Sequence, residues 1–338
     1  MLNNTMINRG EEGKKHLQIR PGPRASAIHA NTLSDRALIK GLDSGLLLVQ
    51  RALAFLGSTA ETLRHMRFNL DYKPMPEDLF IVTYPKSGTT WLQMILYQLM
   101  TDGSMEVPHL NVFAPYLDDI LKGEVDPGPW IGAPARPASK VIKTHAAYSD
   151  APKGCGRYIY VLRDGRDVAV SYYHHHRRNG YGKSFEEFFE SFMRGDVRFG
   201  SWFAHVSGWT ANPENLNVLF VRFEDLVSDL RISIERIAGF CSLPVRSTEW
   251  PRILHNCSFA FMRQHEAKLD IKTRRSFRLQ ADEDHFIWKG KTGEWRSHLD
   301  TPMADAYQLA FQKSFRGRTN ILDPYVSTPA EAVAASAI

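Results

Sequence analysis

Short apolar runs recur along the chain beyond Leu70, and stretches with helical periodicity separate them. The runs predict buried strands, because each is four to six residues long and is bounded by polar or turn-forming residues. The predicted strands are residues 79–83, 141–144, 157–162 and 218–222, and the predicted helices are residues 91–100, 167–176, 185–194 and 226–241. Strands that alternate with helices predict the α/β class, with a single domain in which helices flank a central, mainly parallel sheet.

The length and the hydrophobic content suit one enzyme-sized core, with 43% hydrophobic residues among 338. We expect a polar N-terminal extension at residues 1–33, the domain itself at 34–325 and an alanine-rich tail at 326–338. The pattern of residues 34–67 predicts an amphipathic helix packed on the domain. Because this helix also carries basic side chains, it could alternatively attach to a membrane surface or contact a partner. Its apolar clusters are too short for a transmembrane segment, and loops are expected at 126–138 and 273–284.

The charge balance is mildly basic, with 42 Lys and Arg against 37 Asp and Glu and a net charge of +5. This excess suits a small polyanionic ligand and is too weak and dispersed to indicate nucleic acid. The three cysteines have neither a CxxC pair nor metal-ligand spacing, which argues against a disulfide scaffold or a zinc site. Because the N-terminal region lacks an apolar signal segment, we expect a cytoplasmic location.

Residues 84–91, Tyr-Pro-Lys-Ser-Gly-Thr-Thr-Trp, directly follow the first predicted strand. A strand that runs through a glycine-containing turn into a helix points backbone N–H groups at an anion, so this segment predicts a phosphate-binding loop. Lys86 precedes Gly88, and the GxxxxGK[ST] pattern of nucleotide triphosphatases is absent. A P-loop kinase therefore remains only as the alternative enzyme.

Two further segments place candidate chemistry at strand ends. Lys143 and His145 close the second strand two residues apart, where both side chains could face one cleft. Arg163 follows the third strand and Ser171 lies in the next helix, and this pair suits a phosphate monoester. Each segment also has a purely structural interpretation. His145 could be a structural histidine whose hydrogen bonds are made within the fold, and Arg163 could pair with the carboxylate of Asp167.

Residues 289–295 form a loop rich in lysine and glycine, which could approach an anion or be an ordinary solvated turn.

Taken in order, these segments resemble the cytosolic-type sulfotransferases, which use 3′-phosphoadenosine 5′-phosphosulfate as donor. The matching motifs are TYPKSGTTW at 83–91, KTH at 143–145, YVLRDGRDVAVSYYHH at 160–175, RFEDL at 222–226 and KGKTGEW at 289–295. The resemblance implies a P-loop sulfotransferase fold and sulfuryl transfer to a hydroxyl or amine of a small, hydrophobic acceptor.

The resemblance also implies roles for individual residues. Lys86 would stabilise charge on the departing phosphate, and His145 would be the general base, which suits an imidazole whose ordinary pKa is about 6.5. Trp91 would stack on the adenine, with Phe259 on the opposite face. The implied catalytic residues are His145, Lys86 and Lys143, and the implied cofactor-binding residues are Lys86, Ser87, Gly88, Thr89, Thr90, Trp91, Arg163, Ser171, Phe223, Phe259, Lys289 and Gly290.

The chain departs from the family pattern at several points. Trp288 occupies the position where the family commonly has an arginine that meets the 3′-phosphate, and Phe223 replaces a tyrosine. The KxxxTVxxxE segment through which many relatives dimerise is not found, so homodimerisation stays open. No metal is expected, because no acidic cluster is present and the consecutive His174, His175 and His176 point about 100° apart on a helix. A nucleotide-binding relative without turnover is the non-catalytic alternative.

Overall fold

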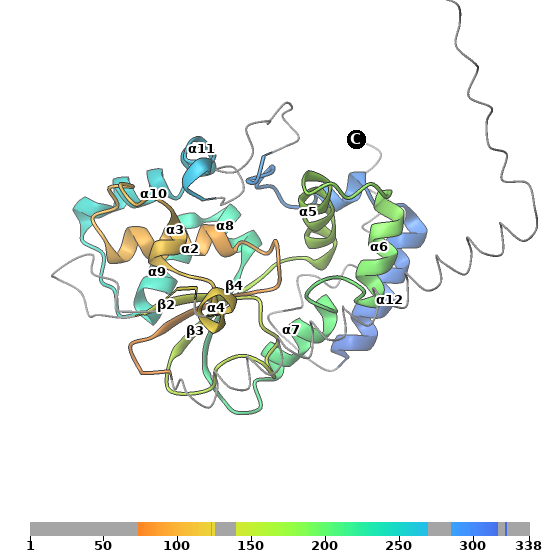
Figure 1. Cartoon of the computed structure of the whole chain (residues 1–338), viewed down its shortest axis with the longest axis horizontal. Helices are drawn as coiled ribbons and strands as arrows, with labels where there is room; N and C mark the ends of the chain where they lie inside the picture. The colour runs from red at the N-terminus through yellow and green to blue at the C-terminus, as the bar shows by residue number, and fades with distance from the viewer. Residues whose placement is uncertain (1–73, 123, 126–139, 270–284, 317–321, 323–338) are drawn as a thin grey trace, which may run out of the picture. The chain divides into compact units, whose positions relative to one another are not determined.

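The computed structural model describes residues 74–122, 124–125, 140–269, 285–316 and 322 (Figure 1). Backbone contacts divide the chain into Met1–Ser58 and Thr59–Ile338, and every described residue belongs to the second unit. The expected extension at 1–33, the amphipathic helix at 34–67 and the tail at 326–338 lie outside the described residues, as do the expected loops at 126–138 and 273–284.

Four parallel strands form a sheet in the order β2-β1-β3-β4. The strands are β1 (Leu79–Thr83), β2 (Val141–Thr144), β3 (Arg157–Leu162) and β4 (Asn217–Arg222). Leu79 pairs with Val141 on one side and with Arg157 on the other, so the strands begin level and their carboxyl ends meet at one edge. This arrangement confirms the predicted parallel sheet and three of the predicted strands, and the fourth strand begins one residue earlier than predicted.

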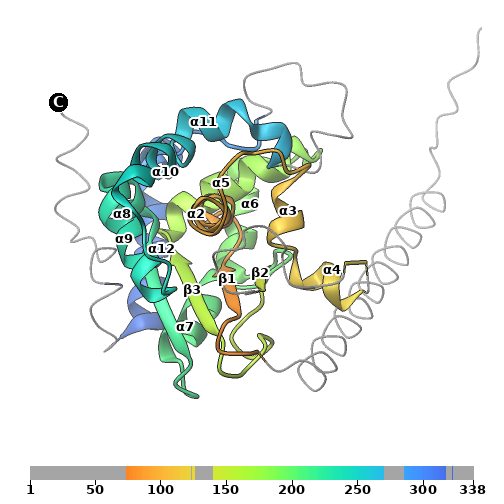
Figure 2. The same cartoon turned by 90° about the vertical axis from the view of Figure 1, so that its left-hand side faces the viewer.

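Helices surround this sheet, and Figure 2 shows them in the second view. The described helices are α2 (Thr89–Met100), α3 (Leu110–Phe113), α4 (Leu117–Leu121), α5 (Gly165–Arg178), α6 (Phe185–Arg194), α7 (Trp202–Ala211), α8 (Phe223–Ser228), α9 (Leu230–Phe240), α10 (Trp250–Asn256), α11 (Phe259–Gln264) and α12 (Thr301–Phe315), with short 3₁₀ helices at Ser247–Glu249, Glu266–Lys268 and Glu294–Ser297. The predicted helices at 91–100 and 185–194 are confirmed as α2 and α6, with α2 beginning two residues earlier.

Alternate residues of β1 face two separate hydrophobic cores. Phe80 and Val82 pack in a cluster with side chains of α5, α6, α7 and α12, whereas Leu79 and Ile81 pack in a cluster with side chains of α2, α9 and α10. This alternation follows from the two-residue period of a strand, and it explains why all of β1 is buried. Figure 1 shows the two groups of helices on opposite sides of the sheet.

The predicted helix at 226–241 is wrong as a single element, because Asp229 separates α8 from α9. Asp229 has extended backbone (φ −146°), and its side chain accepts a hydrogen bond from the Ile232 N–H at 2.9 Å, so it caps the N-terminus of α9. Asp164 caps α5 in the same way by accepting from the Arg166 N–H, and α5 therefore begins at Gly165, two residues before the predicted start. Helices α7 and α12 were not predicted from the sequence.

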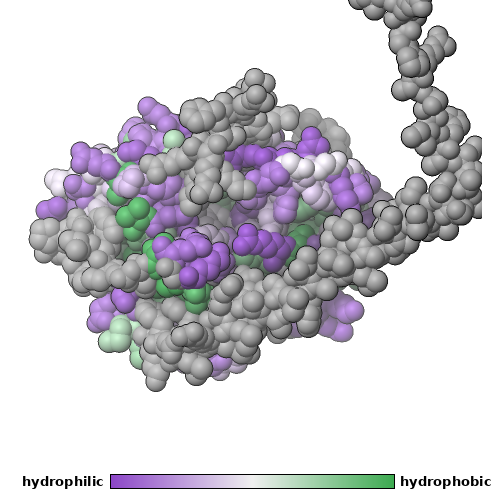
Figure 3. Space-filling model, in the orientation of Figure 1, coloured by the Kyte–Doolittle hydropathy of each residue, from purple (hydrophilic) through white to green (hydrophobic). Residues whose placement is uncertain are grey.

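The surface of the described part is largely polar. Figure 3 shows hydrophilic side chains over most of the coloured area of one face, with a smaller apolar area between them. Among the described residues no helix has both the length and the apolar character needed to cross a membrane. The three cysteines are free thiols, with Cys155 exposed and Cys241 and Cys257 buried.

Candidate active site

The loop between β1 and α2 has the backbone shape that an anion site requires. Lys86 has φ 67° and Gly88 has φ 115°, so the chain turns sharply before α2 begins at Thr89. A Cβ on Gly88 would lie 3.1 Å from the Phe223 ring, which is tighter than an ordinary contact, so the ring would have to shift to admit a larger residue. The N-cap Gly88 provides no side-chain cap and the first turn of α2 has no acidic residue, so the helix itself supplies no anion to the N–H groups of this turn.

His145 follows β2 and is held by the end of β1. Its Nδ1 lies 2.7 Å from the carbonyl oxygen of Thr83 and 3.1 Å from the Thr83 hydroxyl. Because a carbonyl oxygen only accepts, Nδ1 carries the proton and Nε2 keeps its lone pair. The Thr83 hydroxyl also lies 2.6 Å from the hydroxyl of Thr89, so the imidazole is connected to the phosphate loop through two threonines.

Aromatic rings flank this imidazole and lower its basicity. The ring centroids of Tyr116 and Phe199 lie 5.2 Å and 5.0 Å from that of His145. Burial lowers the pKa of His145 to about 3, with the hydrogen bond to Thr83 opposing this shift and the nearby His205 and Lys143 adding to it. The pKa of His145 thus lies well below the ordinary value near 6.5, which local sequence does not reveal because it does not report how densely the ring is surrounded. The imidazole is neutral in the folded protein.

Lys143 is a buried amine that neutral groups hold in place. Its side chain is 7% exposed, and Nζ donates to the side-chain oxygen of Asn111 at 2.5 Å and to that of Gln93 at 3.3 Å. Nζ also lies 4.8 Å from the centroid of the Tyr116 ring. Burial lowers the pKa of Lys143 to about 7, and the charge of Asp119 raises it only in part. A small change in its surroundings therefore decides whether this amine is charged.

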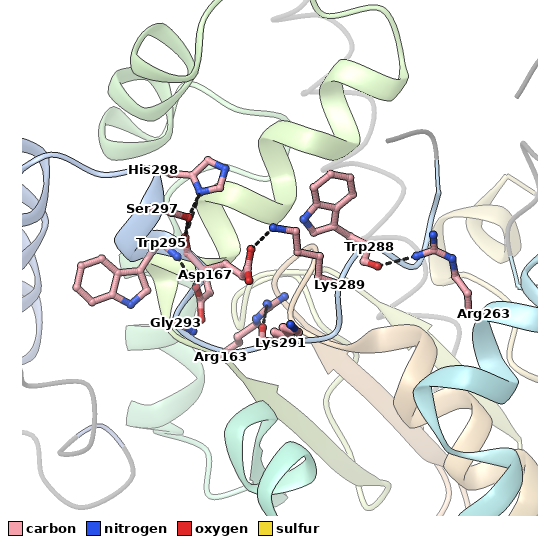
Figure 4. A network of polar contacts seen from close by, with 11 residues as sticks. Arg163, Asp167, Arg263, Trp288, Lys289, Lys291, Gly293, Trp295, Ser297 and His298 are labelled. Carbon is pink, nitrogen blue, oxygen red and sulfur yellow. Dashed lines mark hydrogen bonds and ion pairs between the residues drawn. The ribbon is translucent and has the colours of Figure 1, made fainter. Parts of the chain in front are cut away.

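Arg163 joins the phosphate loop to the basic loop at 289–295. Its guanidinium donates through Nη1 to the carbonyl of Lys86 at 3.0 Å. Through Nη2 it donates to the carbonyl of Lys291, also at 3.0 Å (Figure 4). The guanidinium also lies 4.2 Å from the centroid of the Phe223 ring, which packs beneath it. Asp167, the alternative partner suggested by the sequence, accepts from the backbone N–H groups of Gly293 (2.7 Å) and Trp295 (3.0 Å). Burial raises the pKa of Asp167, and the nearby charge of Arg163 opposes this rise.

The residues expected around an adenine come from three separate elements. The indole N–H of Trp91 donates to the carbonyl of Cys257 at 2.8 Å, two residues before Phe259. Gly290 has φ 62°, and a Cβ there would lie 2.4 Å from the Phe259 ring, so the basic loop and α11 approach each other closely. Phe259 is 41% exposed although it is a large apolar side chain. An exposed aromatic face beside a loop that must contain glycine is a suitable surface for stacking.

The basic loop has further contacts that the sequence did not indicate. Trp288 stacks on His174, with ring centroids 4.0 Å apart and an angle of 21° between the planes. Arg263 of α11 donates through Nη1 to the carbonyls of Ile287 (2.7 Å) and Trp288 (2.8 Å), as Figure 4 shows for Trp288. Lys289 pairs with Glu294 at 2.5 Å.

The described residues contain no group of three or more His, Cys, Asp or Glu side chains that could hold a metal ion.

Most of the expected site residues are thus linked by contacts to one region. Lys86, Arg163 and Phe223 contact one another directly or through the backbone, and Gly290 contacts Phe259. Ser171 is buried on α5, one turn before His174. The sequence analysis missed the supporting residues Gln93, Asn111, His205 and Arg263, because each lies in an ordinary helical or loop pattern and contacts the site only after folding.

The comparisons with known proteins agree with this geometry. A family model described as the sulfotransferase domain matches residues 76–319. Sulfotransferase 1B1 of Mus musculus is 30% identical over 260 residues, which cover 74% of this chain and 86% of that protein. Two crystal structures of retinol dehydratase resemble the fold. The complex with androsterone and the inactive cofactor PAP has a TM-score of 0.64 and 25% identity, and the match covers 77% of this chain and 88% of that one. The complex with retinol and PAP has a TM-score of 0.63 and 26% identity, and the match covers 75% of this chain and 86% of that one. These matches confirm the resemblance seen in the motifs, and the chain belongs to the sulfotransferase family of enzymes.

Proposed function

We propose that this enzyme transfers a sulfuryl group from 3′-phosphoadenosine 5′-phosphosulfate to a hydroxyl or amine of a small hydrophobic acceptor, with His145 as the general base. The observation that carries this proposal is the connection of His145 to the phosphate loop through Thr83 and Thr89. It places a neutral imidazole with a fixed proton on Nδ1 beside the loop that would bind the 5′-phosphosulfate. A kinase or a mere nucleotide-binding protein would not require this imidazole.

The donor would lie along the residues that the structure connects. The N–H groups of Ser87–Thr90 and the ammonium of Lys86 would bind the 5′-phosphosulfate, because they combine a helix N-terminus with a cation. Arg163, Ser171, Lys289 and Gly290 would hold the 3′-phosphate. Trp91 and Phe259 would enclose the adenine, while Phe223 supports Arg163 from below rather than replacing the hydroxyl of the family's tyrosine. Lysines and backbone amides then supply the positive charge at the reacting group.

The proposed chemical step needs one proton acceptor and one stabilised leaving group. His145 Nε2 takes the proton from the acceptor hydroxyl as the acceptor oxygen bonds to sulfur on the face opposite the leaving oxygen. The bond between sulfur and the 5′-phosphate oxygen breaks, and Lys86 with the loop amides stabilises the electron pair left on that oxygen. The Thr83 carbonyl accepts from Nδ1 and so stabilises the imidazolium that forms. The ammonium of Lys143 would act through its charge on the transferring group.

The acceptor is proposed to be a flat hydrophobic alcohol or phenol. Tyr116 and Phe199 flank His145 on two sides, so an acceptor that presents its hydroxyl to Nε2 contacts aromatic surface. Androsterone and retinol, found in structures of a related protein, are hydroxyl-bearing hydrophobic molecules of this kind. The aromatic surroundings favour such acceptors over strongly polar ones.

The test uses the full chain with 35S-labelled donor and a panel of phenols, steroids, long-chain alcohols and amines. Both the labelled product and the acceptor's mass should be measured, because sulfation adds a defined mass. We expect transfer to at least one hydrophobic hydroxyl compound, and we expect His145→Ala to reduce turnover about 10²–10⁴-fold while binding of 3′-phosphoadenosine 5′-phosphate is unchanged. The exposed His255 offers a matched control, since His255→Ala should leave turnover intact.

The competing functions give different results in the same experiments. A larger thermal shift with ATP than with 3′-phosphoadenosine 5′-phosphate would favour a kinase. Binding of 3′-phosphoadenosine 5′-phosphate without transfer to any acceptor in the panel would favour the non-catalytic alternative. Wild-type turnover in His145→Ala would remove His145 as the base without affecting the donor assignment.

We also propose a cytoplasmic location, which the free state of all three cysteines supports because thiols persist in reducing compartments. Fluorescence microscopy of the tagged full chain tests it, and secretion or fractionation with membranes would contradict it.

A further inference from the structure

The basic loop carries a tryptophan where the family commonly has an arginine for the 3′-phosphate, so another group must complete this part of the donor site. We propose that the indole N–H of Trp288 and Nε2 of His174 together form a neutral hydrogen-bonding anchor for the 3′-phosphate of the donor. The proposal rests on the proposed function, because it specifies how that donor is held. Its starting point is the stack of the two rings, with centroids 4.0 Å apart.

The two nitrogens have one property in common. Nε1 of Trp288 and Nε2 of His174 are both inaccessible to solvent, and neither has a hydrogen-bond partner among the described residues. A buried polar nitrogen without a partner is unfavourable, and native proteins satisfy more than nine in ten of such groups. Here two of them lie in adjacent, nearly parallel rings. A ligand oxygen that accepts from both would satisfy them together.

The position of this pair on α5 agrees with a phosphate ligand. Ser171 and His174 lie three residues apart on the helix and therefore share one face. Ser171 is buried, and the resemblance already implies that it holds the 3′-phosphate with Arg163. Because Trp288 stacks on His174, the basic loop passes over the same face of α5 as Ser171.

The backbone of the loop is fixed on both sides of the proposed anchor. Arg163 donates to the carbonyl of Lys291 at 3.0 Å, and Arg263 donates to the carbonyl of Trp288 at 2.8 Å. Figure 4 shows the Trp288 indole and the Lys289 side chain on the same side of the loop, with Arg263 approaching from the other side. The loop is thus held by main-chain hydrogen bonds that do not depend on the indole. Substitution of the Trp288 ring should leave the loop in place.

The charges around the pair explain why the anchor is neutral without a ligand. Burial, together with the nearby His298, Lys289 and Arg177, lowers the pKa of His174 to about 4, whereas Glu294 opposes this shift. Lys289 is paired with Glu294 at 2.5 Å, and its ammonium lies 5.6 Å from the Trp288 ring centroid. A phosphate dianion placed beside His174 would oppose these effects and raise the pKa of the imidazole.

The experiment compares two nucleotides that differ only at the 3′ position. Calorimetry on the full chain measures binding of 3′-phosphoadenosine 5′-phosphate and of 5′-AMP, which lacks the 3′-phosphate. Trp288→Phe and His174→Phe each keep an aromatic ring for stacking and remove the nitrogen. We expect each variant to bind the bisphosphate about five- to tenfold more weakly, with 5′-AMP binding unchanged. Trp288→Arg should retain the preference, and Trp250→Phe, on α10 outside the site, serves as the matched control.

The outcomes separate the anchor from the donor assignment. If the wild type binds 5′-AMP as tightly as the bisphosphate, the donor assignment itself fails. If the wild type prefers the bisphosphate and both phenylalanine variants keep the full preference, the donor assignment stands and the stack is packing only, which overturns the inference. Because a variant could fold poorly, the pKa of His174 in the wild type gives an independent test by NMR. It should rise with the bisphosphate and not with 5′-AMP, and equal pKa values in the two complexes would also overturn the inference.

Discussion

The guanidinium of Arg163 donates a hydrogen bond to the backbone carbonyl of Lys86 across 3.0 Å. The second terminal nitrogen of the same side chain donates to the carbonyl of Lys291, at the same distance. One buried side chain at the end of β3 therefore fixes both the phosphate loop and the basic loop. Charge stabilisation at the leaving phosphate would depend on the position of Lys86. That position is set by a residue that the sequence indicated as a phosphate ligand or as the partner of Asp167.

We predict that Arg163→Lys weakens both the fold and donor binding. Lysine has no planar fork and cannot bridge two carbonyls, so at least one of them loses its donor. The free energy of unfolding should fall by about 1–3 kcal/mol, and the affinity for 3′-phosphoadenosine 5′-phosphate should fall at least about tenfold. Denaturant unfolding and calorimetry measure the two effects. Arg231→Lys, at an exposed pair with Glu235, should change neither, and equal behaviour of the two variants would contradict the bridging role.

We predict that Gly290→Ala impairs donor binding although it adds a single methyl group. The residue has φ 62°, and its Cβ would lie 2.4 Å from the Phe259 ring, so either the loop or the ring must move. The affinity for 3′-phosphoadenosine 5′-phosphate should drop about tenfold or more in a calorimetric titration. Gly239→Ala is the matched control, because that helical glycine has open space at its Cβ position and should stabilise the protein by about 0.5–1 kcal/mol. Unaltered binding in Gly290→Ala would show that Phe259 and the loop do not form part of the donor site.

We predict that the buried His205 makes the protein less stable as the pH falls below about 6.5. Its Nδ1 lies 2.9 Å from the Tyr160 hydroxyl and its Nε2 lies 3.2 Å from the His145 carbonyl, and burial lowers its pKa to about 4. Between about pH 6.5 and pH 4 the unfolded chain therefore binds a proton that the folded protein does not, so the free energy of unfolding decreases as pH falls through this window.

The measurement is the free energy of unfolding of the wild type and of His205→Gln between pH 4.5 and 7.5. The free energy of unfolding should change with pH more steeply in the wild type than in the variant, by up to about 1.4 kcal/mol per pH unit. This difference corresponds to the binding of one proton. Differences between the two curves remove the contributions of other histidines with lowered pKa values. Parallel curves would show that the pKa of His205 is the same in the folded and the unfolded protein. Because His205 also contacts the backbone of His145, the variant should in addition lower kcat more than it changes donor affinity.

We predict that the charge of Lys143 sets the alkaline limit of activity. Burial lowers its pKa to about 7, so the ammonium loses its proton as the pH rises through this value. On this alkaline limb of the pH–rate profile, kcat/KM should therefore fall. Asn111→Asp would place a carboxylate where the amide oxygen now lies 2.5 Å from Nζ, which should raise the pKa of Lys143 and move the limb to higher pH. Asn111→Leu should move it to lower pH. Identical pH–rate profiles for the three proteins would show that Lys143 does not limit the reaction.

The strand pattern and the motifs at strand ends were predictable from local sequence. Residues 79–83, 141–144 and 157–162 form strands at the predicted positions, because short apolar runs bounded by turn residues are typical of strands that a parallel sheet buries on both faces. The break at Asp229 was missed, since a capping aspartate inside a continuous helical period is visible only once its side chain is seen to accept from Ile232. Helix α12 was missed because no motif drew attention to its pattern.

The sequence by itself determined the order of strands and helices, the phosphate loop and the family, because periodicity and contiguous motifs are properties of neighbouring residues. Tertiary structure alone decided that Thr83 fixes the proton of His145, that Arg163 bridges two loops, and that Trp288 stacks on His174. Each of these contacts joins residues that are far apart in the chain, and each depends on main-chain carbonyls or ring planes whose positions follow from the packing of whole elements. The lowered pKa values of His145 and Lys143 have the same origin, since burial is a property of the folded chain and not of any local pattern.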